Sequence, residues 1–431
     1  MDFKEANRAI LDRKMTMVEL AELTLKNIKE QDQKIKSFIF LDEDLLLAQA
    51  YNFDIEIASG RFRKNLGLTL SVKDNIYVSG LGIGMGTDLW KIEKSGFDAR
   101  VISNLKESGA LIVGKTKTAE FAIHKPPDTR NPIDYAAAVG TSSTGSAASV
   151  SANFVMASIG TQSAASVIKP ASYCNVIGFK PSYGMIPRTG ILKTADTLDS
   201  VGFFSKDYET LDVVFAGSLV SGIDHPFNNI KANMEQNKKK IRIAILLGPE
   251  ISSERVQFQF MEKVDKLLRN TNFDRIEIDL NRIVEEARTT HRNLYYGNVA
   301  YFLAQDLQID FNKLSPELQE VIEFGNKVTQ LELHEARLMQ EKFTTLVDDM
   351  FEDVDYILTP STFDVPPDFG KSDQINDSSF FWTLCGNPTI SIPGAMSFNG
   401  ERYVGLQVIA KKYNDYNLIE FAKQLHRIWG E

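Results

Sequence analysis

The first third of the chain alternates between helical and strand-like patterns of apolar residues. Thr16 and Glu19 have the spacing of a capping box, and the apolar residues after them recur at helical spacing. Residues 66–72 form a short apolar, β-prone run, 99–108 have a helical pattern, and 110–114 have the pattern of a buried strand. Strands and helices in alternation indicate an α/β sheet.

The second half of the chain predicts a further strand–helix–strand unit and then a long helical region. Residues 241–247 and 275–280 have strand patterns on either side of a helical pattern at 254–270. The polar stretch 228–240 before them resembles a connection between two halves, and 281–350 is almost wholly helical in pattern. The chain then closes with three strand patterns and a helix, at 356–359, 389–392, 404–408 and 415–429.

Composition and charge favour a large globular protein and exclude several functional classes. Of 431 residues, 43% are hydrophobic, and the formal net charge of −9 argues against a broad nucleic-acid-binding surface. No stretch approaches the roughly 18 uninterrupted apolar residues of a membrane helix, and no signal-peptide pattern is visible. Cys174 and Cys385 are too few for a disulfide framework, which is typical of reduced thiols. We therefore expect a cytoplasmic protein without a nucleic-acid or membrane partner.

Histidine and cysteine offer no metal site in the sequence. The five histidines are scattered without ligand spacing, and the two cysteines are isolated. Glycine-rich phosphate-binding motifs do not occur in a strand-to-helix context, and the G-x-S-x-G motif of Ser-His-Asp hydrolases is absent. We expect neither a metal nor an organic cofactor.

Hydroxyl side chains gather in one segment of small residues, between Gly140 and Gly190. A serine nucleophile needs a base, and without a histidine the plausible base is a lysine kept neutral by desolvation. Lys73 directly follows the apolar run at 66–72, which would bury its amine at the edge of the sheet. Segments of this composition are more often loops, and a lone lysine is more often solvated. The pattern by itself therefore leaves both interpretations open.

Two longer motifs resemble those of the amidase signature family. Leu70–Ile76 resembles its lysine motif, and 140–170, continuing through 174–184, resembles its serine- and glycine-rich signature. Further similarity follows in the same order along the chain, at 114–116, 120–122, 199–202, 358–360, 386–388 and 405–407. The resemblance implies a single amidase-like domain over 1–431. Its fold would be α/β, with a large mixed, mostly parallel central sheet covered by helices on both faces.

The resemblance also implies a catalytic triad. By position in the motifs, Lys73 corresponds to the base, Ser142 to the serine that relays protons and Ser166 to the nucleophile. In this family the relaying serine typically sits in a cis peptide. The oxyanion hole would be formed by the backbone N–H groups of the loop that ends at the nucleophile, namely Ser163, Ala164, Ala165 and Ser166.

The signature departs from the family pattern at four positions. Ala164 and Ala165 replace two glycines, which would strain the loop if its backbone had positive φ there and would narrow the acyl side of the site. Gln162 and Ile168 stand where the pattern has Asp and Arg. Because both members of this potential charge pair are replaced together, no charge is left buried alone, and we expect the fold to tolerate the change. Cys174 is at a position where the family often has cysteine, and we interpret it as buried packing.

The helical region 281–350 is the part that we expect to shape the substrate pocket. Its Tyr295, Tyr296, Tyr301 and Phe302 are candidates for an acyl or aryl pocket. Aromatic residues at helical spacing are nevertheless more often part of a core, and we favour that interpretation.

Three functions fit these observations. The first is hydrolysis of a small-molecule carboxamide through an acyl-enzyme on Ser166. The second passes the same acyl group to an amine, which would make the protein an amide-forming acyltransferase in a biosynthetic pathway. The third is a catalytically impaired binding protein, as in a transfer-RNA-dependent amidotransferase complex. The altered signature keeps the second and third open. A homodimer is the oligomer that we consider.

Overall fold

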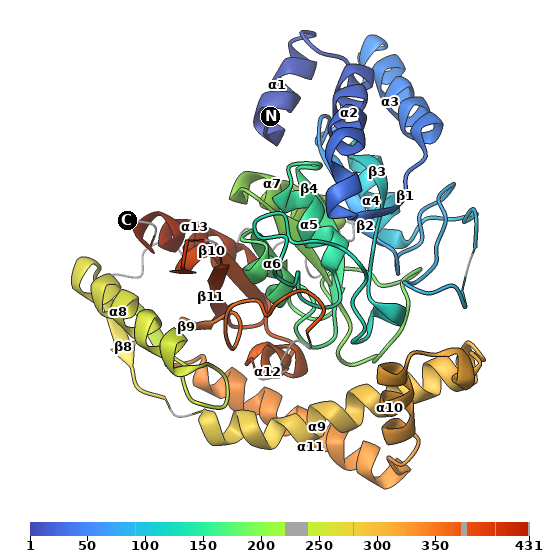
Figure 1. Ribbon diagram of the computed structural model, residues 1–431. Coiled ribbons are helices and arrows are strands. Elements are labelled where there is room, and N and C mark those ends of the chain that lie inside the picture. Colours follow the sequence, from blue (N-terminus) through green and yellow to red (C-terminus); the bar gives the residue numbers. More distant parts are fainter. Residues whose placement is uncertain (91, 220–239, 279, 372–376, 401, 430–431) are drawn as a thin grey trace.

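An eleven-stranded sheet runs through the molecule (Figure 1). The computed structural model describes every residue except 91, 220–239, 279, 372–376, 401 and 430–431. Within the described residues the strand order is β1-β3-β2-β4-β6-β5-β10-β11-β9-β7-β8. The strands are β1 (Phe38–Phe40), β2 (Thr69–Lys73), β3 (Leu111–Thr116), β4 (Ala157–Gln162), β5 (Ile177–Lys180), β6 (Ser200–Ser205), β7 (Ile241–Ile245), β8 (Phe273–Ile276), β9 (Tyr356–Pro360), β10 (Thr389–Phe398) and β11 (Arg402–Ala410).

The sheet confirms the expected mixed α/β fold, but the expectation that it is mostly parallel is wrong. Among the described strands, four neighbouring pairs are parallel, β3–β2, β2–β4, β9–β7 and β7–β8. The other six pairs are antiparallel. Parallel neighbours need a crossover connection, and the helical patterns at 99–108 and 254–270 supply two of them. The strands in the middle of the sheet pair antiparallel, as β5 does with β6 and β10 with β11.

Helices cover both faces of this sheet. The helices are α1 (Phe3–Leu11), α2 (Met17–Ile35), α3 (Glu43–Ala58), α4 (Arg100–Ser108), α5 (Thr144–Ser151), α6 (Ile168–Tyr173), α7 (Tyr208–Ser218), α8 (Glu254–Asn270), α9 (Asn281–Ala300), α10 (Pro316–Gly325), α11 (Gln330–Met350), α12 (Ser379–Leu384) and α13 (Asp415–Trp429). One face packs against α4, α7, α8 and α13, where Leu70 and Val72 of β2 join Leu211 and Leu425 in one apolar cluster.

The opposite face is covered by two separate groups of helices. Helices α2, α3, α5 and α6 cover one part, where Leu111 and Val113 of β3 pack with Ala147 of α5. Helices α9 to α12 cover the other part, where Ile357 of β9 packs with Trp382 of α12. In Figure 1, α2 and α3 lie at the top of the view and α9 to α11 run along the bottom. The small-residue helices α5 and α6 lie between them, next to the expected active site.

Several of the predicted helix and strand boundaries can be compared with those in the structure. Helix α2 begins after Thr16, and the capping box with Glu19 is present as expected, with the Glu19 backbone N donating to Thr16 Oγ1 over 3.0 Å. The expected helical region contains α9, α10 and α11. The strand expected at 275–280 is instead β8, which ends at Ile276. The elements that the sequence patterns did not predict are α1, β1, α3, α5, β4, α6, β5, β6, α7 and α12. The expected connection at 228–240 lies outside the described residues except for its last residue.

Gly145 lies where α5 closely approaches a neighbouring backbone. A Cβ there would lie 2.3 Å from Ser37 O and 2.6 Å from Lys117 N, and neither atom belongs to a flexible side chain. We expect Gly145→Ala to lower the free energy of unfolding by about 1–3 kcal/mol, the usual cost of overpacking, measured by chemical denaturation. Gly96→Ala is the control, because its Cβ would have no atom within 4 Å. Equal stability of the two variants would contradict the close approach.

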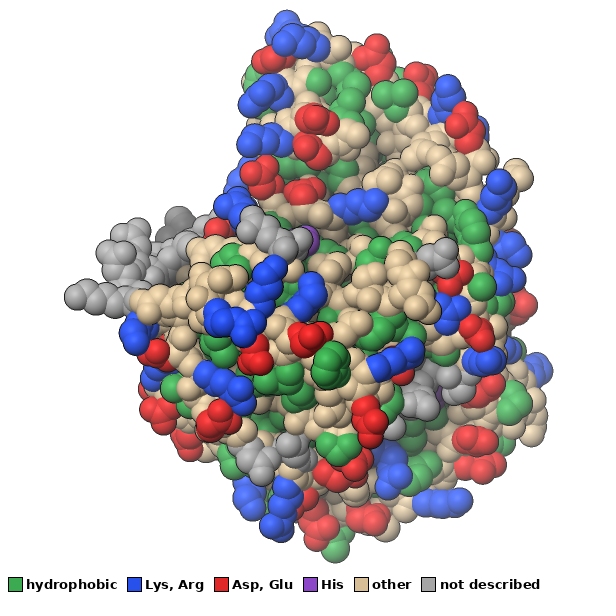
Figure 2. Space-filling model, turned by 60° about the vertical axis from the view of Figure 1, so that its left-hand side comes forward, with side chains coloured by type: hydrophobic (Ala, Val, Ile, Leu, Met, Phe, Trp, Pro, Cys, Tyr) green, Lys and Arg blue, Asp and Glu red, His purple; other side chains and the backbone are tan. Residues whose placement is uncertain are grey.

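The surface mixes both signs of charge. On the face shown in Figure 2, basic and acidic side chains are interspersed rather than separated. Of the helices that the structure describes, none has the length and apolar character needed to cross a membrane.

Candidate active site

Lys73, at the end of β2, is completely buried. Its Nζ lies 2.7 Å from Ser142 Oγ and 2.9 Å from Thr161 Oγ1, and it also lies 3.4 Å from Thr161 O. Asn75 Nδ2 donates to the same Thr161 hydroxyl over 3.0 Å. Burial lowers the pKa of Lys73 to about 7, an effect that the carboxylate of Asp199 partly opposes. The amine is therefore held among hydroxyls in a state that exchanges protons near neutral pH.

Three buried lysines lie in this sheet, and their partners distinguish them. Lys115 pairs with the Asp74 carboxylate over 3.0 Å. Lys180, whose pKa burial also lowers to about 7, donates to the carbonyl oxygens of Asn387 over 2.6 Å and of Pro181 over 3.0 Å. Lys73 alone among the three contacts the hydroxyl groups of Ser142 and Thr161. The lowered pKa is therefore shared with Lys180, and the neighbouring hydroxyl groups are what set Lys73 apart.

Ser142 lies just before α5, and the Thr141–Ser142 peptide bond is cis, as the resemblance predicts. The residue is buried, and its carbonyl oxygen accepts from Thr118 Oγ1 over 3.1 Å and from Ala119 N over 3.3 Å. Backbone contacts on one side and the Lys73 amine on the other thus hold Ser142 in place.

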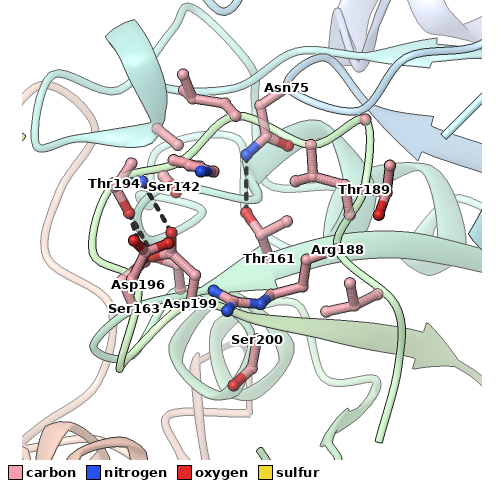
Figure 3. Close-up of a pocket in the computed structure, with 17 residues that line it drawn as sticks. Asn75, Ser142, Thr161, Ser163, Arg188, Thr189, Thr194, Asp196, Asp199 and Ser200 are labelled. Atoms are coloured by element: carbon pink, nitrogen blue, oxygen red, sulfur yellow. Dashed lines mark hydrogen bonds between the residues drawn. The ribbon is translucent and has the colours of Figure 1, made fainter. Parts of the chain in front are cut away.

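Ser166 follows β4 in the loop that leads to α6. It lines a cavity of about 520 Å³ together with Ser142 and Thr161, and it also lines a second cavity of about 980 Å³. Figure 3 shows Ser142 and Thr161 in the first cavity. Within the described part of the chain, the Ser166 hydroxyl has no hydrogen-bond partner. The structure thus joins Lys73 to Ser142 and places Ser142 and Ser166 on one cavity, without a direct hydrogen bond between the two serine hydroxyls.

A carboxylate network supports Ser163, the first residue of the loop 163–167, which carries the expected nucleophile Ser166 and which we call the nucleophile loop. Ser163 Oγ donates to Asp199 over 2.5 Å, and the hydroxyl of Thr194 lies 2.5 Å from the same carboxylate oxygen. The backbone N–H groups of Thr194 and Ala195 donate to the other carboxylate oxygen over 2.8 and 3.0 Å. Burial raises the pKa of Asp199, against the hydrogen bonds from Ser163 and Thr194, which lower it. Figure 3 shows this cluster on the cavity wall.

The four departures from the family pattern are accommodated. Ala164 and Ala165 are not among the residues with positive φ, so their methyl groups cause no strain of that kind. Gln162 Oε1 accepts from the backbone N–H groups of Val167 over 2.8 Å and of Ile168 over 3.1 Å, so the amide side chain holds the loop closed. Ile168 is buried without a charge to satisfy.

The amide N–H groups expected to form an oxyanion hole have no acceptor in the part of the chain that the structure describes. The N–H groups of Ala164, Ala165 and Ser166 donate no hydrogen bond to any described group. Elsewhere in the signature, Cys174 is buried and burial raises the pKa of its thiol, which confirms its interpretation as packing.

The second cavity draws much of its wall from the helical region. Tyr295 and Tyr296 of α9 and Phe324 of α10 line it, next to Ala165 and Ser166. The core interpretation holds for Phe302 and for Tyr295, which are buried, and Tyr296 packs against the same core as Tyr295. Tyr301 is 60% exposed and belongs to neither a core nor this cavity. The region 281–350 thus contributes aromatic side chains beside Ser166.

The first cavity carries charged side chains, as the second does through Arg292 and Glu317. Arg188, Lys193 and Asp196 line the first cavity with the hydroxyl residues. Arg188 Nη2 donates to the Tyr183 hydroxyl over 3.0 Å. Figure 3 shows the Arg188 guanidinium among the side chains on this wall. This cavity therefore suits a polar group.

Sequence reasoning missed several residues of the site. Thr161, Asn75 and Asp199 lie inside the quoted motifs, so their position gave a signal that was available but not used. His291 lies 2.9 Å through Nε2 from Ser163 O, and Thr383 Oγ1 donates to Ala164 O over 2.8 Å. Neither is near the signature in the chain, and the sequence carries no sign of these contacts.

Comparison with known proteins shows which family the chain belongs to. The sequence profile of the Amidase family matches residues 19–419, so the chain belongs to that family. Its chemistry is therefore of the amide-hydrolysis type. A glutamyl-tRNA(Gln) amidotransferase subunit from Endomicrobium trichonymphae is 27% identical, with 99% of this chain and 96% of that protein covered. The protein of the same name from Natranaerobius thermophilus is 28% identical, with 98% and 94% covered.

Solved structures share the fold over the whole chain. A crystal structure of an amidase matches with a TM-score of 0.88 at 24% identity and 99% coverage of both chains. The native peptide amidase from Stenotrophomonas maltophilia matches with a TM-score of 0.81 at 20% identity, with 99% of this chain and 97% of that chain covered. These likenesses confirm the expected amidase fold.

Proposed function

We propose that the protein cleaves a carboxamide of a small molecule through an acyl-enzyme on Ser166, with Ser142 as proton relay and Lys73 as base. The observation that carries this proposal is the buried Lys73 amine, 2.7 Å from Ser142 Oγ, beside a cavity that Ser142 shares with Ser166. A neutral amine has two N–H groups and one lone pair. Lys73 Nζ contacts Thr161 Oγ1, Thr161 O and Ser142 Oγ. In the neutral form that we propose, its two N–H groups donate to Thr161 and its lone pair accepts from the Ser142 hydroxyl.

The proposed reaction begins with a proton relay. Lys73 takes the proton of Ser142 as Ser142 takes that of Ser166, and the Ser166 oxygen bonds to the amide carbon. The two serine hydroxyls approach each other for this step when substrate binds, since catalytic hydrogen bonds often tighten only in the complex. The carbon–nitrogen bond then breaks, and the relayed proton returns through Ser142 to the leaving amine. Water attacks the acyl-enzyme by the same relay.

Charge on the carbonyl oxygen is stabilised by backbone amides in this proposal. The N–H groups of Ala164, Ala165 and Ser166 have no partner among the described groups, and an oxyanion would supply one. One such donor contributes about 3–4 kcal/mol to transition-state stabilisation. Free amides beside the nucleophile are thus what this chemistry requires.

The two cavities suggest how a substrate lies across Ser166. Ser142, which returns the proton to the leaving nitrogen, lines the first cavity. We therefore place the amine portion in this polar cavity, with Arg188 and Asp196, and the acyl portion in the second cavity, with Tyr295 and Tyr296. This assignment predicts a substrate with a polar amine part and with an acyl part bulky enough to contact Tyr295 and Tyr296.

A second candidate is transfer to an acceptor in place of water. It is supported by the two cavities that meet at Ser166. The relatives named as amidotransferase subunits support a different arrangement, in which the protein is one component of a complex and hands its product to a protein partner. A homodimer remains the alternative assembly.

Partition of the acyl-enzyme distinguishes the two candidates. We expect aryl and alkyl carboxamides to yield mainly the free acid in water, and only a minor hydroxamate product when hydroxylamine is added in excess. The measurement is the ratio of acid to hydroxamate by mass spectrometry, with Ser166→Ala as the blank. Hydroxamate as the main product at low hydroxylamine concentration would favour acyl transfer, and no product from any amide would count against both.

A further inference from the structure

Two side chains from distant helices hold the carbonyl oxygens of the nucleophile loop. His291 of α9 lies with Nε2 2.9 Å from Ser163 O. Thr383 of α12 donates through Oγ1 to Ala164 O over 2.8 Å. Each carbonyl belongs to the peptide unit whose N–H is that of the next residue. Ser163 O therefore shares a rigid plane with the Ala164 N–H, and Ala164 O shares one with the Ala165 N–H.

In a trans peptide unit the C=O and the N–H point in opposite directions. A hydrogen bond that fixes the carbonyl on one side therefore fixes the direction of the N–H on the other. We infer that His291 and Thr383 are positioning residues that turn the N–H groups of Ala164 and Ala165 toward the reacting carbonyl by holding the opposite ends of their peptide units. This inference rests on the proposed acyl-enzyme function, because it assigns a purpose to those two amides.

The chemistry of each contact supports this role. Ser163 O can only accept, so His291 Nε2 must carry a hydrogen, and this fixes the tautomer of the neutral ring. Burial lowers the pKa of His291 to about 4, so the ring stays neutral and keeps that tautomer at ordinary pH. His291 also packs against Phe380, with ring centroids 5.4 Å apart, which restricts its rotation. The imidazole therefore acts as a fixed donor rather than as a general base.

The Thr383 contact is part of a longer chain that includes one of the departures from the family pattern. Gln162 Nε2 donates to Thr383 Oγ1 over 3.0 Å, while Gln162 Oε1 accepts from Val167 N and Ile168 N. With Gln162 as donor, the Thr383 hydrogen is available for Ala164 O at 2.8 Å or for Ser379 O at 3.0 Å. Gln162 thus contacts the end of the nucleophile loop directly, at Val167 and the adjoining Ile168, and its beginning through Thr383, which donates to Ala164 O.

The inference requires that loss of a carbonyl contact slows the chemistry more than it weakens binding. A misdirected oxyanion donor removes an interaction made in the transition state, so kcat falls while KM changes little. Loss of one whole donor lowers kcat about 100-fold to 1000-fold, and partial misdirection by a lost support is expected to lower it at least about tenfold. A side chain that only supports the fold would instead lower the melting temperature and change kcat and KM without this split.

Matched variants separate the hydrogen bond from the packing. His291→Gln keeps an N–H donor at nearly the reach of Nε2, whereas His291→Leu keeps the bulk without a donor. Thr383→Ser keeps the hydroxyl, whereas Thr383→Val keeps the shape without it. We expect the Leu and Val variants to show at least a tenfold lower rate constant for phosphonylation by a fluorophosphonate and for amide turnover, with KM and melting temperature close to wild type. The Gln and Ser variants should recover most of both rates.

The outcomes are distinct for this inference and for the proposed function. Phosphonylation of His291→Leu and Thr383→Val at the wild-type rate, with Ser166→Ala unlabelled, would overturn the positioning role and leave the proposed function standing. Equal loss in the donor-keeping and donor-lacking variants would also overturn it, because the hydrogen bond would not be the cause. A wild-type protein that takes no label on Ser166 would overturn the proposed function and the inference together. If His291→Leu unfolds, the two Thr383 variants test the positioning role. If Thr383→Val unfolds, the two His291 variants test it.

Discussion

Replacing Ser166 with alanine is expected to abolish amide turnover and fluorophosphonate labelling while the fold stays intact. Ser166 lines both cavities, and within the described residues its hydroxyl holds no partner that the change would leave unsatisfied. Removal of a serine nucleophile lowers kcat by up to about 10⁶-fold, because the remaining groups have no atom on which to form the acyl-enzyme. The measurement is kcat on a cleaved amide together with the intact mass after incubation with the probe.

Ser200→Ala is the matched control for this experiment. Ser200 lines the same first cavity, but its hydroxyl donates to Leu198 O over 3.2 Å and contacts neither Lys73 nor Ser142. The control should take one adduct at the wild-type rate. Retention of the adduct or of turnover in Ser166→Ala would place the nucleophile elsewhere and remove the basis of the proposed mechanism.

The parts of the site that lie within one motif could be predicted from the sequence. The apolar run at 66–72 predicted a buried strand, and a lysine at its end is then desolvated; the structure shows both the burial and the lowered pKa of Lys73. The resemblance placed Ser142 in a cis peptide, which the structure confirms. Burial and position in a motif are local properties, so one sequence was enough to predict them.

The parts that depend on distant segments could not be predicted. His291 and Thr383 reach the nucleophile loop from 128 and 219 residues away along the chain. As a single histidine in an amphipathic helix, His291 looks like an ordinary core residue. The strain considered for Ala164 and Ala165 depended on a backbone angle that composition does not specify. The antiparallel pairing of the middle strands β4, β6, β5, β10 and β11 likewise follows from tertiary contacts, which is why the sheet is less parallel than expected.

Replacing Lys73 with methionine is expected to lower turnover at least about 1000-fold, since the relay loses the group that starts it and general-base catalysis contributes 10²–10⁴-fold.

Wild-type kcat/KM should rise about tenfold per pH unit below a midpoint near 7 and level off above it, because the neutral amine is the active form and burial lowers the pKa of Lys73 to about 7. Initial rates between pH 5 and 9 measure this profile. A profile that is flat across neutral pH would contradict Lys73 as the base.

The pH dependence of the free energy of unfolding provides a second, independent test of the lowered pKa of Lys73. Lys73 has a pKa of about 7 when folded and 10.5 as its ordinary value, so between these pH values the unfolded chain binds more protons. Its contribution makes the folded state more stable as pH rises through this window, by up to about 1.4 kcal/mol per pH unit. Lys73→Met should therefore flatten the rise in unfolding free energy without removing it, because Lys180 has the same lowered pKa and remains. Methionine fills a similar volume without a charge to desolvate, so the variant should also be at least as stable as wild type at pH 7. A variant that is inactive, stable and flatter in its pH dependence would show that Lys73 is retained at a cost in stability because its proton chemistry is needed.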